Sequence, residues 1–167
     1  NIIDILYIMC IWRVVMRINY ENAKSEIIST LEKNRNWVLS TSYKDKVSSR
    51  TMSIINNGLD IYFQTNKCYL KYDEISNNNN VSLCFNNISI EGIAEEIGNW
   101  KDPKNTELMN LYKSVHPSSF DAYGLLDGQV VYKVIPTKIK VWKYVDGKPL
   151  REFLYIKEGI AEQLDFM

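Results

Sequence analysis

The sequence predicts a mainly β protein of the α+β class, an antiparallel β-barrel with helices packed on it. About seven or eight short segments are rich in β-branched and aromatic residues and are separated by turn residues. About two or three segments show helical spacing, and most strands follow one another with no helix between them. Parallel strands need such crossover connections, so the order of elements favours antiparallel pairing. At 167 residues, the chain has the length of one domain with its own core.

The first predicted helix follows Asn19, a residue type that caps helix starts. Apolar residues at positions 23, 27, 28 and 31 alternate with polar ones, which is the pattern of an amphipathic helix covering a core. The cluster Asn34-Arg35-Asn36 ends this helix, and residues 37–42 are predicted as the first strand. Nothing in this helix indicates chemistry.

The segment 47–71 is predicted as a β-hairpin around which the rest of the chain is arranged. Two β-rich runs flank Asn56-Asn57-Gly58, and Asn and Gly tolerate the positive φ of a tight turn. Arg50 precedes this turn, and Lys67 and Lys71 follow it, so cations gather beside hydroxyls and free backbone N–H groups. Such a set can hold a phosphate, although cations at strand ends are commonly only solvated.

Further along, a short helix is predicted to end in the Asn-rich loop 77–80, because asparagine favours turns over helices and strands. Residues 81–85 and 88–97 are predicted as strands, with Gly92 as a bulge or a point of close backbone approach. Asp102-Pro103 begins another helix, with the aspartate as cap and the proline in the first turn.

The last third of the chain is predicted to add strands at 130–136 and 138–144, broken at Pro136. Asp146-Gly147-Lys148 is a hairpin turn, after which residues 150–156 can pair back.

His116 stands before a proline at the end of a predicted helix and is the one histidine of the chain. A residue so placed most often caps a helix or lies at the surface, and local spacing puts no serine, cysteine or carboxylate beside it for catalysis. Cys10, Cys68 and Cys84 are isolated and odd in number, which argues against a disulfide framework. A His/Cys metal site is therefore not expected, and a reducing cytoplasm is the expected compartment.

The charge balance bears on possible partners. Lysine plus arginine and aspartate plus glutamate both number 20, so the formal net charge is zero. A protein that binds nucleic acid or a membrane surface normally carries a basic excess, so neither partner is expected. The 11 tyrosines and 4 tryptophans suit a β-rich core, an interface or a planar ligand without choosing among them.

Residues 1–15 differ from the rest of the chain as an apolar run interrupted by Asp4 and Arg13. The run is too short to span a bilayer and lacks the basic start and cleavage site of a signal peptide. We expect Met16 to begin the native protein, with residues 1–15 as an extra segment before a single domain at 16–167. The alternative is a real edge strand or an interface segment.

An ordered series of motifs extends from Trp37 to about Tyr144. It consists of Arg50-Thr51-Met52, Tyr62-Phe63-Gln64-Thr65-Asn66, Lys71, Val81-Ser82-Leu83-Cys84-Phe85, Ile90-Glu91-Gly92-Ile93-Ala94-Glu95 and the run from Val134 to Trp142. This series resembles the pyridoxamine 5′-phosphate oxidase-like family of FMN-binding split barrels, in its general-stress and nitroimidazole-resistance (Nim) branch. The resemblance implies a six-stranded antiparallel split β-barrel that forms a homodimer, with two FMN molecules in symmetric clefts between the subunits.

The resemblance also implies a set of FMN contacts: Arg50, Thr51, Met52, Ser53, Ile54, Ile55, Gln64, Thr65, Lys71, Asn87 and Trp142. In this set Arg50 and Lys71 would contact the phosphate, and the strand from Thr51 to Ile55 would run along the flavin. Gln64 and Thr65 would lie on the facing strand. Asn87 falls where the oxidases carry a flavin-contacting glutamine, and Trp142 would come from the partner subunit and border the ring. FMN needs such cations, polar groups and apolar walls.

The chain departs from true pyridoxamine phosphate oxidases after Trp142. Those enzymes end in an Arg-x-His-Asp-Arg-type motif that recognises substrate and flavin, whereas residues 148–152 here are Lys-Pro-Leu-Arg-Glu. Only Arg151 could partly substitute, so oxidation of vitamin B6 is not expected.

More than one function class stays open. The first is an oxidoreductase that passes electrons from NAD(P)H through FMN to a small acceptor, such as a nitro compound or a quinone. The second is a flavin-binding or stress-related protein without efficient turnover, and a third is a haem-binding split barrel with His116 as the available imidazole. No GxGxxG motif is present, so NAD(P)H would bind only transiently over the flavin.

Overall fold

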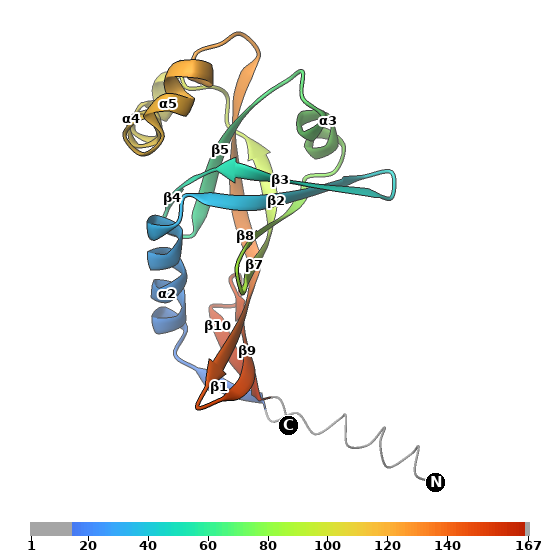
Figure 1. Cartoon of the computed structure of the whole chain (residues 1–167), viewed down its shortest axis with the longest axis vertical. Helices are drawn as coiled ribbons and strands as arrows, with labels where there is room; N and C mark the ends of the chain where they lie inside the picture. The colour runs from blue at the N-terminus through green and yellow to red at the C-terminus, as the bar shows by residue number, and fades with distance from the viewer. Residues whose placement is uncertain (1–14, 166–167) are drawn as a thin grey trace.

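The computed structural model describes residues 15–165, and their strands form one hydrogen-bonded antiparallel sheet (Figure 1). The strands are β1 (Val15–Ile18), β2 (Asn36–Tyr43), β3 (Lys46–Ser53), β4 (Ile55–Asn57), β5 (Asp60–Asn66), β6 (Asn80–Phe85), β7 (Ile88–Glu96), β8 (Gln129–Val145), β9 (Lys148–Tyr155) and β10 (Ile160–Asp165). The helices and helical turns are α2 (Tyr20–Lys33), α3 (Leu70–Asn77), η1 (Pro103–Asn105), α4 (Thr106–Val115), α5 (Pro117–Ser119) and η2 (Phe120–Gly124). The predicted fold class is confirmed, with more strands in this part of the chain than the sequence predicts.

Strand β8 is the centre of the sheet. Its first part, residues 129–134, pairs with β5, and its second part, residues 138–145, pairs with β9, while β7 follows it on the other side. The sheet therefore divides along β8, one branch closing over the core and the other extending away as β9, β10 and β1 (Figure 1).

The predicted break at Pro136 is wrong, because β8 runs unbroken for 17 residues. Gly92 pairs with Pro136 while Glu91 pairs with Lys138, so Thr137 is an extra residue in a β-bulge. A proline costs no ladder hydrogen bond at such an irregularity, so the strand continues through it.

Gly92 is confirmed as a point of close approach. A Cβ atom at this position would lie 2.7 Å from the carbonyl oxygen of Ile135 and 2.8 Å from Cγ1 of Val134. Only glycine lets β7 and β8 come this close at the bulge.

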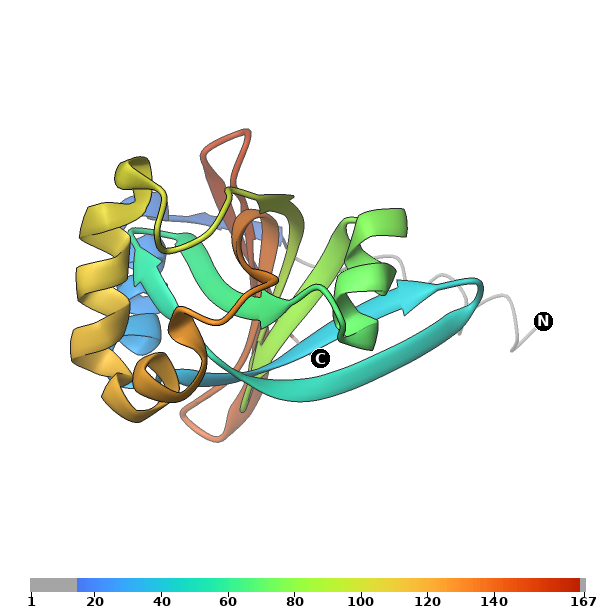
Figure 2. The ribbon, with the colours of Figure 1, turned by 90° about the horizontal axis from the view of Figure 1, so that it is seen from above.

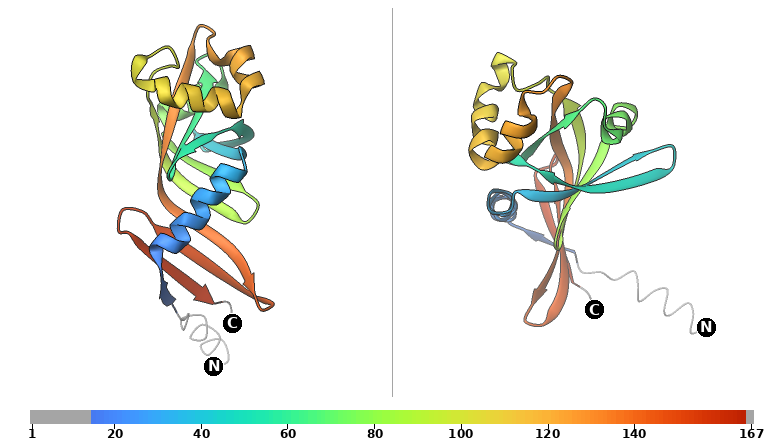
Figure 3. Two further views of the ribbon diagram at one scale, coloured as in Figure 1. Left: turned by 90° about the vertical axis from the view of Figure 1, so that its left-hand side faces the viewer. Right: turned by 45° about the horizontal axis from the view of Figure 1, so that its top comes forward.

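Helix α2 begins as the sequence predicts. The side chain of Asn19 accepts a hydrogen bond from the N–H of Asn22 at 2.9 Å, and Ala23, Ile27 and Leu31 are buried in the main core. The helix lies along the side of the barrel toward the β9–β10 extension (Figure 3).

The hairpin containing Asn56-Asn57-Gly58 is present, but it joins β4 to β5 and does not include the strand of Arg50. Gly58 has a φ of 60° at the turn. Strand β3 instead pairs with β2 through a turn at Lys44 and Asp45, which have φ values of 49° and 58°. This β2–β3 ribbon extends outward past the barrel (Figures 1 and 2).

Two apolar cores result from these connections. The main core fills the barrel and holds Trp37, Phe63 and Leu83. A second core lies under α4, where Trp100 and Tyr112 pack on Val131 of β8. Helices α4 and α5 thus cover one side of the barrel, while α3 lies on the other side (Figure 2).

The prediction for residues 1–15 falls outside the described residues except at Val15. Val15 and Met16 both belong to β1, which pairs with β10 at the edge of the sheet. Among residues 15–165, no helix combines the length and the apolar composition that crossing a membrane requires.

Candidate functional site

A pocket of about 180 Å³ lies between β3, β5, the start of α3 and the α4–η2 cover. Its lining consists of Thr51, Met52, Ser53, Gln64, Thr65, Tyr69, Lys71, Tyr112, Ser119, Tyr123 and Gln129. Six of these are among the residues that the sequence predicts as FMN contacts: Thr51, Met52, Ser53, Gln64, Thr65 and Lys71. The fold therefore gathers residues from β3, β5 and α3 around one space.

Lys71 lines this pocket, and Arg50, which does not line it, is close enough for its charge to act on Lys71. Lys71 lies in the first turn of α3, with its Nζ 4.5 Å from the ring centroid of Tyr69. Burial lowers the pKa of Lys71, the nearby charge of Arg50 lowers it further, and Cys68 opposes these effects. Two neighbouring cations that disfavour each other make a place where an anion is stabilised.

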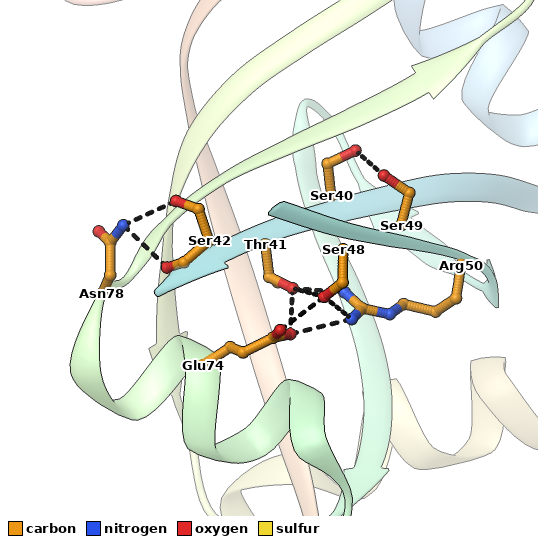
Figure 4. A network of polar contacts seen from close by, with 8 residues as sticks. All are labelled: Ser40, Thr41, Ser42, Ser48, Ser49, Arg50, Glu74 and Asn78. Atoms are coloured by element: carbon orange, nitrogen blue, oxygen red, sulfur yellow. Dashed lines mark hydrogen bonds and ion pairs between the residues drawn. The ribbon is translucent and has the colours of Figure 1, made fainter. Parts of the chain in front are cut away.

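Arg50 is held by a polar cluster on the β2–β3 ribbon (Figure 4). Its guanidinium donates to Thr41 Oγ1, to Ser48 Oγ at 2.6 Å and to Glu74 Oε2 at 2.9 Å. Thr41 and Ser48 in turn each donate to the Glu74 carboxylate at 2.6 Å. Each hydroxyl therefore accepts from the arginine and donates to the glutamate, which fixes the guanidinium in one orientation.

Glu74 is buried, with 5% of its surface exposed, and the sequence reading missed it. Burial by itself would raise its pKa, but the hydrogen bonds from Ser48, Thr41 and Arg50 and the charge of Arg50 together hold the pKa below its ordinary value. The charges of Arg50, Lys71 and Glu74 together sum to one positive charge. The available signal was its spacing, because it follows Lys71 by three residues on one helix face.

Gln64 ties β5 to the helical cover. Its amide oxygen accepts from Trp100 Nε1 at 2.8 Å, and its amide nitrogen donates to the carbonyl and hydroxyl oxygens of Ser119 at 3.3 and 3.2 Å. Ser119 Oγ also lies 3.1 Å from the hydroxyl of Tyr112, whose pKa is raised by burial. The pocket wall on this side is thus internally hydrogen-bonded.

Thr65 and Gln129 differ from Gln64. Thr65 is 3% exposed and Gln129 is 8% exposed, and both line the pocket. Neither Thr65 Oγ1 nor Gln129 Oε1 has a hydrogen-bond partner within residues 15–165. Buried polar atoms are rarely left unpaired, so each of these two atoms still has the capacity for a hydrogen bond. The sequence reading missed Gln129, for which only the preceding Gly128 gave a turn signal.

Ile54 and Ile55 do not line the pocket, because their side chains are buried in the two cores. The N–H of Ile54 donates to the carbonyl of Arg35 at 2.9 Å, and its own carbonyl lies 2.9 Å from His116 Nε2. The N–H of His116 also bonds to the carbonyl of Tyr112, ending α4. His116 is therefore a capping residue that joins α4 to the chain after β3.

Asn87 and Trp142 lie together, and neither lines this pocket. The Asn87 side chain donates to the Trp142 carbonyl, and the N–H of Trp142 donates to the Asn87 carbonyl at 3.0 Å. The Trp142 ring lies 5.5 Å from the guanidinium carbon of Arg151. Along this part of β8, Ile139 and Val141 are buried while Trp142 is on the other face.

Other pockets offer fewer side chains that could bind or react with a ligand. One of about 320 Å³ lies over β2, β6 and β7 and is lined mostly by small residues, with Glu91 as its titratable side chain. Another of about 230 Å³ lies under α2, where Lys143 already bonds to Glu26 at 2.6 Å and to Glu152 at 2.8 Å. Within residues 15–165, no three His, Cys, Asp or Glu residues are grouped as metal ligands would be.

Comparison with known proteins gives a partial match by sequence. General stress protein 26 of Bacillus subtilis (strain 168) is 35% identical over 65 residues, which is 39% of this chain and 46% of that protein. The match thus spans about half of the relative's length. No family model matches the chain.

Solved structures extend the likeness to most of the fold. General stress protein 26 of Bacillus anthracis str. Sterne has a TM-score of 0.60 and 26% identity over 80% of this chain and 98% of that one. A pyridoxamine 5′-phosphate oxidase-like protein of Listeria innocua has a TM-score of 0.57 and 23% identity, covering 71% and 97%. A NimC/NimA family protein of Clostridium acetobutylicum has a TM-score of 0.54 and 15% identity, covering 89% and 96%. The resemblance inferred from the sequence is confirmed in these neighbours.

Proposed function

We propose that this chain, a split barrel of the pyridoxamine 5′-phosphate oxidase-like kind that resembles general stress protein 26, binds FMN in the pocket beside Lys71. Bound FMN supplies reversible two-electron chemistry, which in this proposal carries electrons from NAD(P)H to a small acceptor such as a nitro compound or a quinone. The proposed protein is a homodimer of the cytoplasm.

The observation that carries the proposal is the convergence of six predicted FMN contacts on one pocket with a cationic end. Lys71 and the oriented guanidinium of Arg50 suit a dianionic phosphate. The unpartnered atoms of Thr65 and Gln129 suit the uncharged polar groups of a flavin. Met52 and Tyr69 supply apolar wall, so the residues present fit the cofactor.

The partner subunit has a defined part in this proposal. Asn87 and Trp142 are joined by two hydrogen bonds and lie outside the pocket of their own chain. If Trp142 borders the flavin bound by the partner subunit, Asn87 lies at the same cleft, because the two residues are hydrogen-bonded to each other. The packing of Arg151 on the Trp142 ring keeps that aromatic in place. Pyridoxamine phosphate oxidation is not part of the proposal, since the ending that recognises its substrate is missing.

The proposed electron transfer and the proposed cofactor each have an alternative. A flavin-binding protein without efficient turnover would use the same pocket. Haem binding is less well supported, because the Nε2 atom of His116 is already hydrogen-bonded to a backbone carbonyl. The visible spectrum of freshly purified protein separates the cofactors, since a flavin gives yellow protein and haem gives red.

The phosphate assignment is tested with Lys71→Ala and Arg50→Ala. Each loses a charge-assisted contact worth about 1.5–3 kcal/mol, so FMN affinity should fall roughly ten- to a hundredfold in a fluorescence titration. Lys71→Ala is the cleaner variant, because Arg50→Ala also leaves the Glu74 carboxylate without its cation.

Riboflavin and a matched lysine serve as controls. Riboflavin lacks the phosphate, so the preference of the wild-type protein for FMN should shrink in Lys71→Ala. Lys67→Ala removes an exposed lysine that does not line the pocket and should leave FMN affinity within about twofold. Equal FMN affinity in the wild type, Arg50→Ala and Lys71→Ala would remove the phosphate site from the proposal.

A further inference from the structure

Two buried polar atoms, Thr65 Oγ1 and Gln129 Oε1, belong to residues that line the same pocket and have no partners among the described residues. Each belongs to a side chain more than nine-tenths buried. An unpaired buried polar group destabilises a folded protein, and most such groups in native structures are paired. Two of them in one pocket call for a partner that arrives from outside the chain.

The position of Gln129 is fixed before any ligand binds. The Asn66 side chain donates to the carbonyl of Asp127 at 2.8 Å, and the N–H of Lys67 donates to the carbonyl of Gly128 at 2.9 Å. Asn66 also pairs with Gln129 in the β5–β8 ladder. The turn before Gln129 is therefore held on β5, so the position of Gln129 at the start of β8 is preorganised.

The kind of ligand atom follows from the chemistry of the two groups. A carboxamide oxygen only accepts, so Gln129 Oε1 needs an N–H or O–H donor. A phosphate dianion offers only acceptors and cannot satisfy it. The Thr65 hydroxyl can donate as well as accept. The partner for Gln129 must therefore belong to the uncharged part of the ligand.

We propose that Gln129 is a specificity-determining residue that accepts a hydrogen bond from an uncharged N–H or O–H donor of the flavin bound in this pocket. The proposal rests on the proposed FMN function and adds to it a residue outside the family motifs. In oxidised FMN two sources supply such a donor, the ring N3–H and the hydroxyls of the ribityl chain.

Gln129→Met tests the proposal with a change of nearly equal size. Because Oε1 is unpaired in the free protein, the melting temperature of the flavin-free variant should stay equal or rise. Its dissociation constant for FMN should increase about five- to tenfold, since one hydrogen bond to the ligand is lost. A residue with a merely structural role would show the opposite pattern.

Gln64→Met is the matched control. This second buried glutamine lines the same pocket, but both ends of its amide are already bonded to Trp100 and Ser119. Its replacement should lower the melting temperature of the flavin-free protein. If Gln129→Met fails to fold, Thr65→Val tests the other unpaired atom of the pocket lining, with the same expectation of undiminished stability and weaker FMN binding.

FMN methylated at N3 distinguishes the two donor sources. If the donor is N3–H, the methylated flavin binds more weakly than FMN to the wild type, and this difference disappears in Gln129→Met. If a ribityl hydroxyl donates, the wild type binds both flavins alike and Gln129→Met weakens both equally. Either result supports the proposal.

The inference is overturned if Gln129→Met and Thr65→Val bind both flavins as tightly as the wild type, which would mean that water fills this part of the pocket. It is also overturned if Gln129→Met dissociates the subunits without changing flavin affinity. A wild-type protein that binds neither FMN nor riboflavin would instead contradict the proposed function itself, so the two failures are distinguishable.

Discussion

At the scale of single residues, Glu74 shows how a buried charge is made tolerable. Two hydroxyls and one guanidinium surround its carboxylate, so all of its partners are supplied within the fold. Buried carboxylates that are fully hydrogen-bonded stay ionised, whereas removal of one partner leaves an uncompensated charge. The orientation of Arg50 and the stability of the β2–β3 ribbon on α3 therefore depend on the same group.

Glu74→Gln should make the stability of the protein less dependent on pH in acid. The folded-state pKa of Glu74 lies below its ordinary value of 4.5, which applies in the unfolded chain. Its contribution to the free energy of unfolding is therefore complete above that pH and is lost as the pH falls through the folded-state pKa. Urea unfolding at several pH values should show a shallower acid loss in Glu74→Gln than in the wild type. Asp73→Asn, on an exposed part of the same helix, serves as the control. Equal acid slopes in wild type and Glu74→Gln would contradict the assignment.

Part of the candidate site was predicted from the sequence, and physical reasons explain why its other residues were not. Lys71 and Thr65 belong to the ordered series of motifs that resembles the family, so they were predicted as site residues from the sequence. Glu74 and Gln129 belong to no motif, and their importance appears only when α3 and the start of β8 are folded against β3 and β5. Ile54 and Ile55 continue the motif strand, but the chain turns there and buries them in the two cores.

At the scale of elements, β8 shows which features a local pattern can predict. A strand on each side of Pro136 was predicted from the sequence, and so was the special role of Gly92. The continuity of the strand could not be predicted from the sequence, because it depends on a bulge that only pairing with β7 creates. The pairing of β3 with β2 was missed, because the sequence pattern assigned the strand of Arg50 to the Asn56-Asn57-Gly58 hairpin.

Gly92→Ala should destabilise the protein by about 1–3 kcal/mol, because the added methyl group would press on the backbone of Ile135 and force the strands apart. Thermal and urea unfolding measure this directly. Glu91→Ala, at the exposed neighbouring position of the same strand, should change stability by no more than about 0.5 kcal/mol. A variant Gly92→Ala as stable as Glu91→Ala would mean that β7 and β8 adjust freely at the bulge.

At the scale of the whole molecule, the chain leaves apolar surface that one barrel does not cover. Val38 is 39% exposed and Val47 is 73% exposed, both on the outward β2–β3 ribbon. Tyr144 and Val145, at the far end of β8, are exposed as well. Exposed apolar residues on projecting elements suit an interface, which agrees with the proposed homodimer.

The protein should sediment as a dimer, and its FMN occupancy should depend on that state. The reason is that Trp142 and Asn87 can complete a flavin site only from a second subunit in the proposed arrangement. Sedimentation velocity across a dilution series, followed at the absorbance of bound FMN, measures both quantities together. A monomer that keeps one FMN per chain would contradict the proposed cleft between subunits.

The extra residue in β8 has a consequence for the length of the chain. Before the bulge, Val130, Tyr132 and Val134 face the main core, and after it the odd-numbered Ile139 and Val141 do. Deleting a residue within a strand normally moves every side chain beyond it to the opposite face of the sheet. Deleting Thr137 would instead leave a regular alternation, with Pro136 and Ile139 still facing inward. Within β8, Thr137 is thus the place where evolution can shorten this chain without exposing its core.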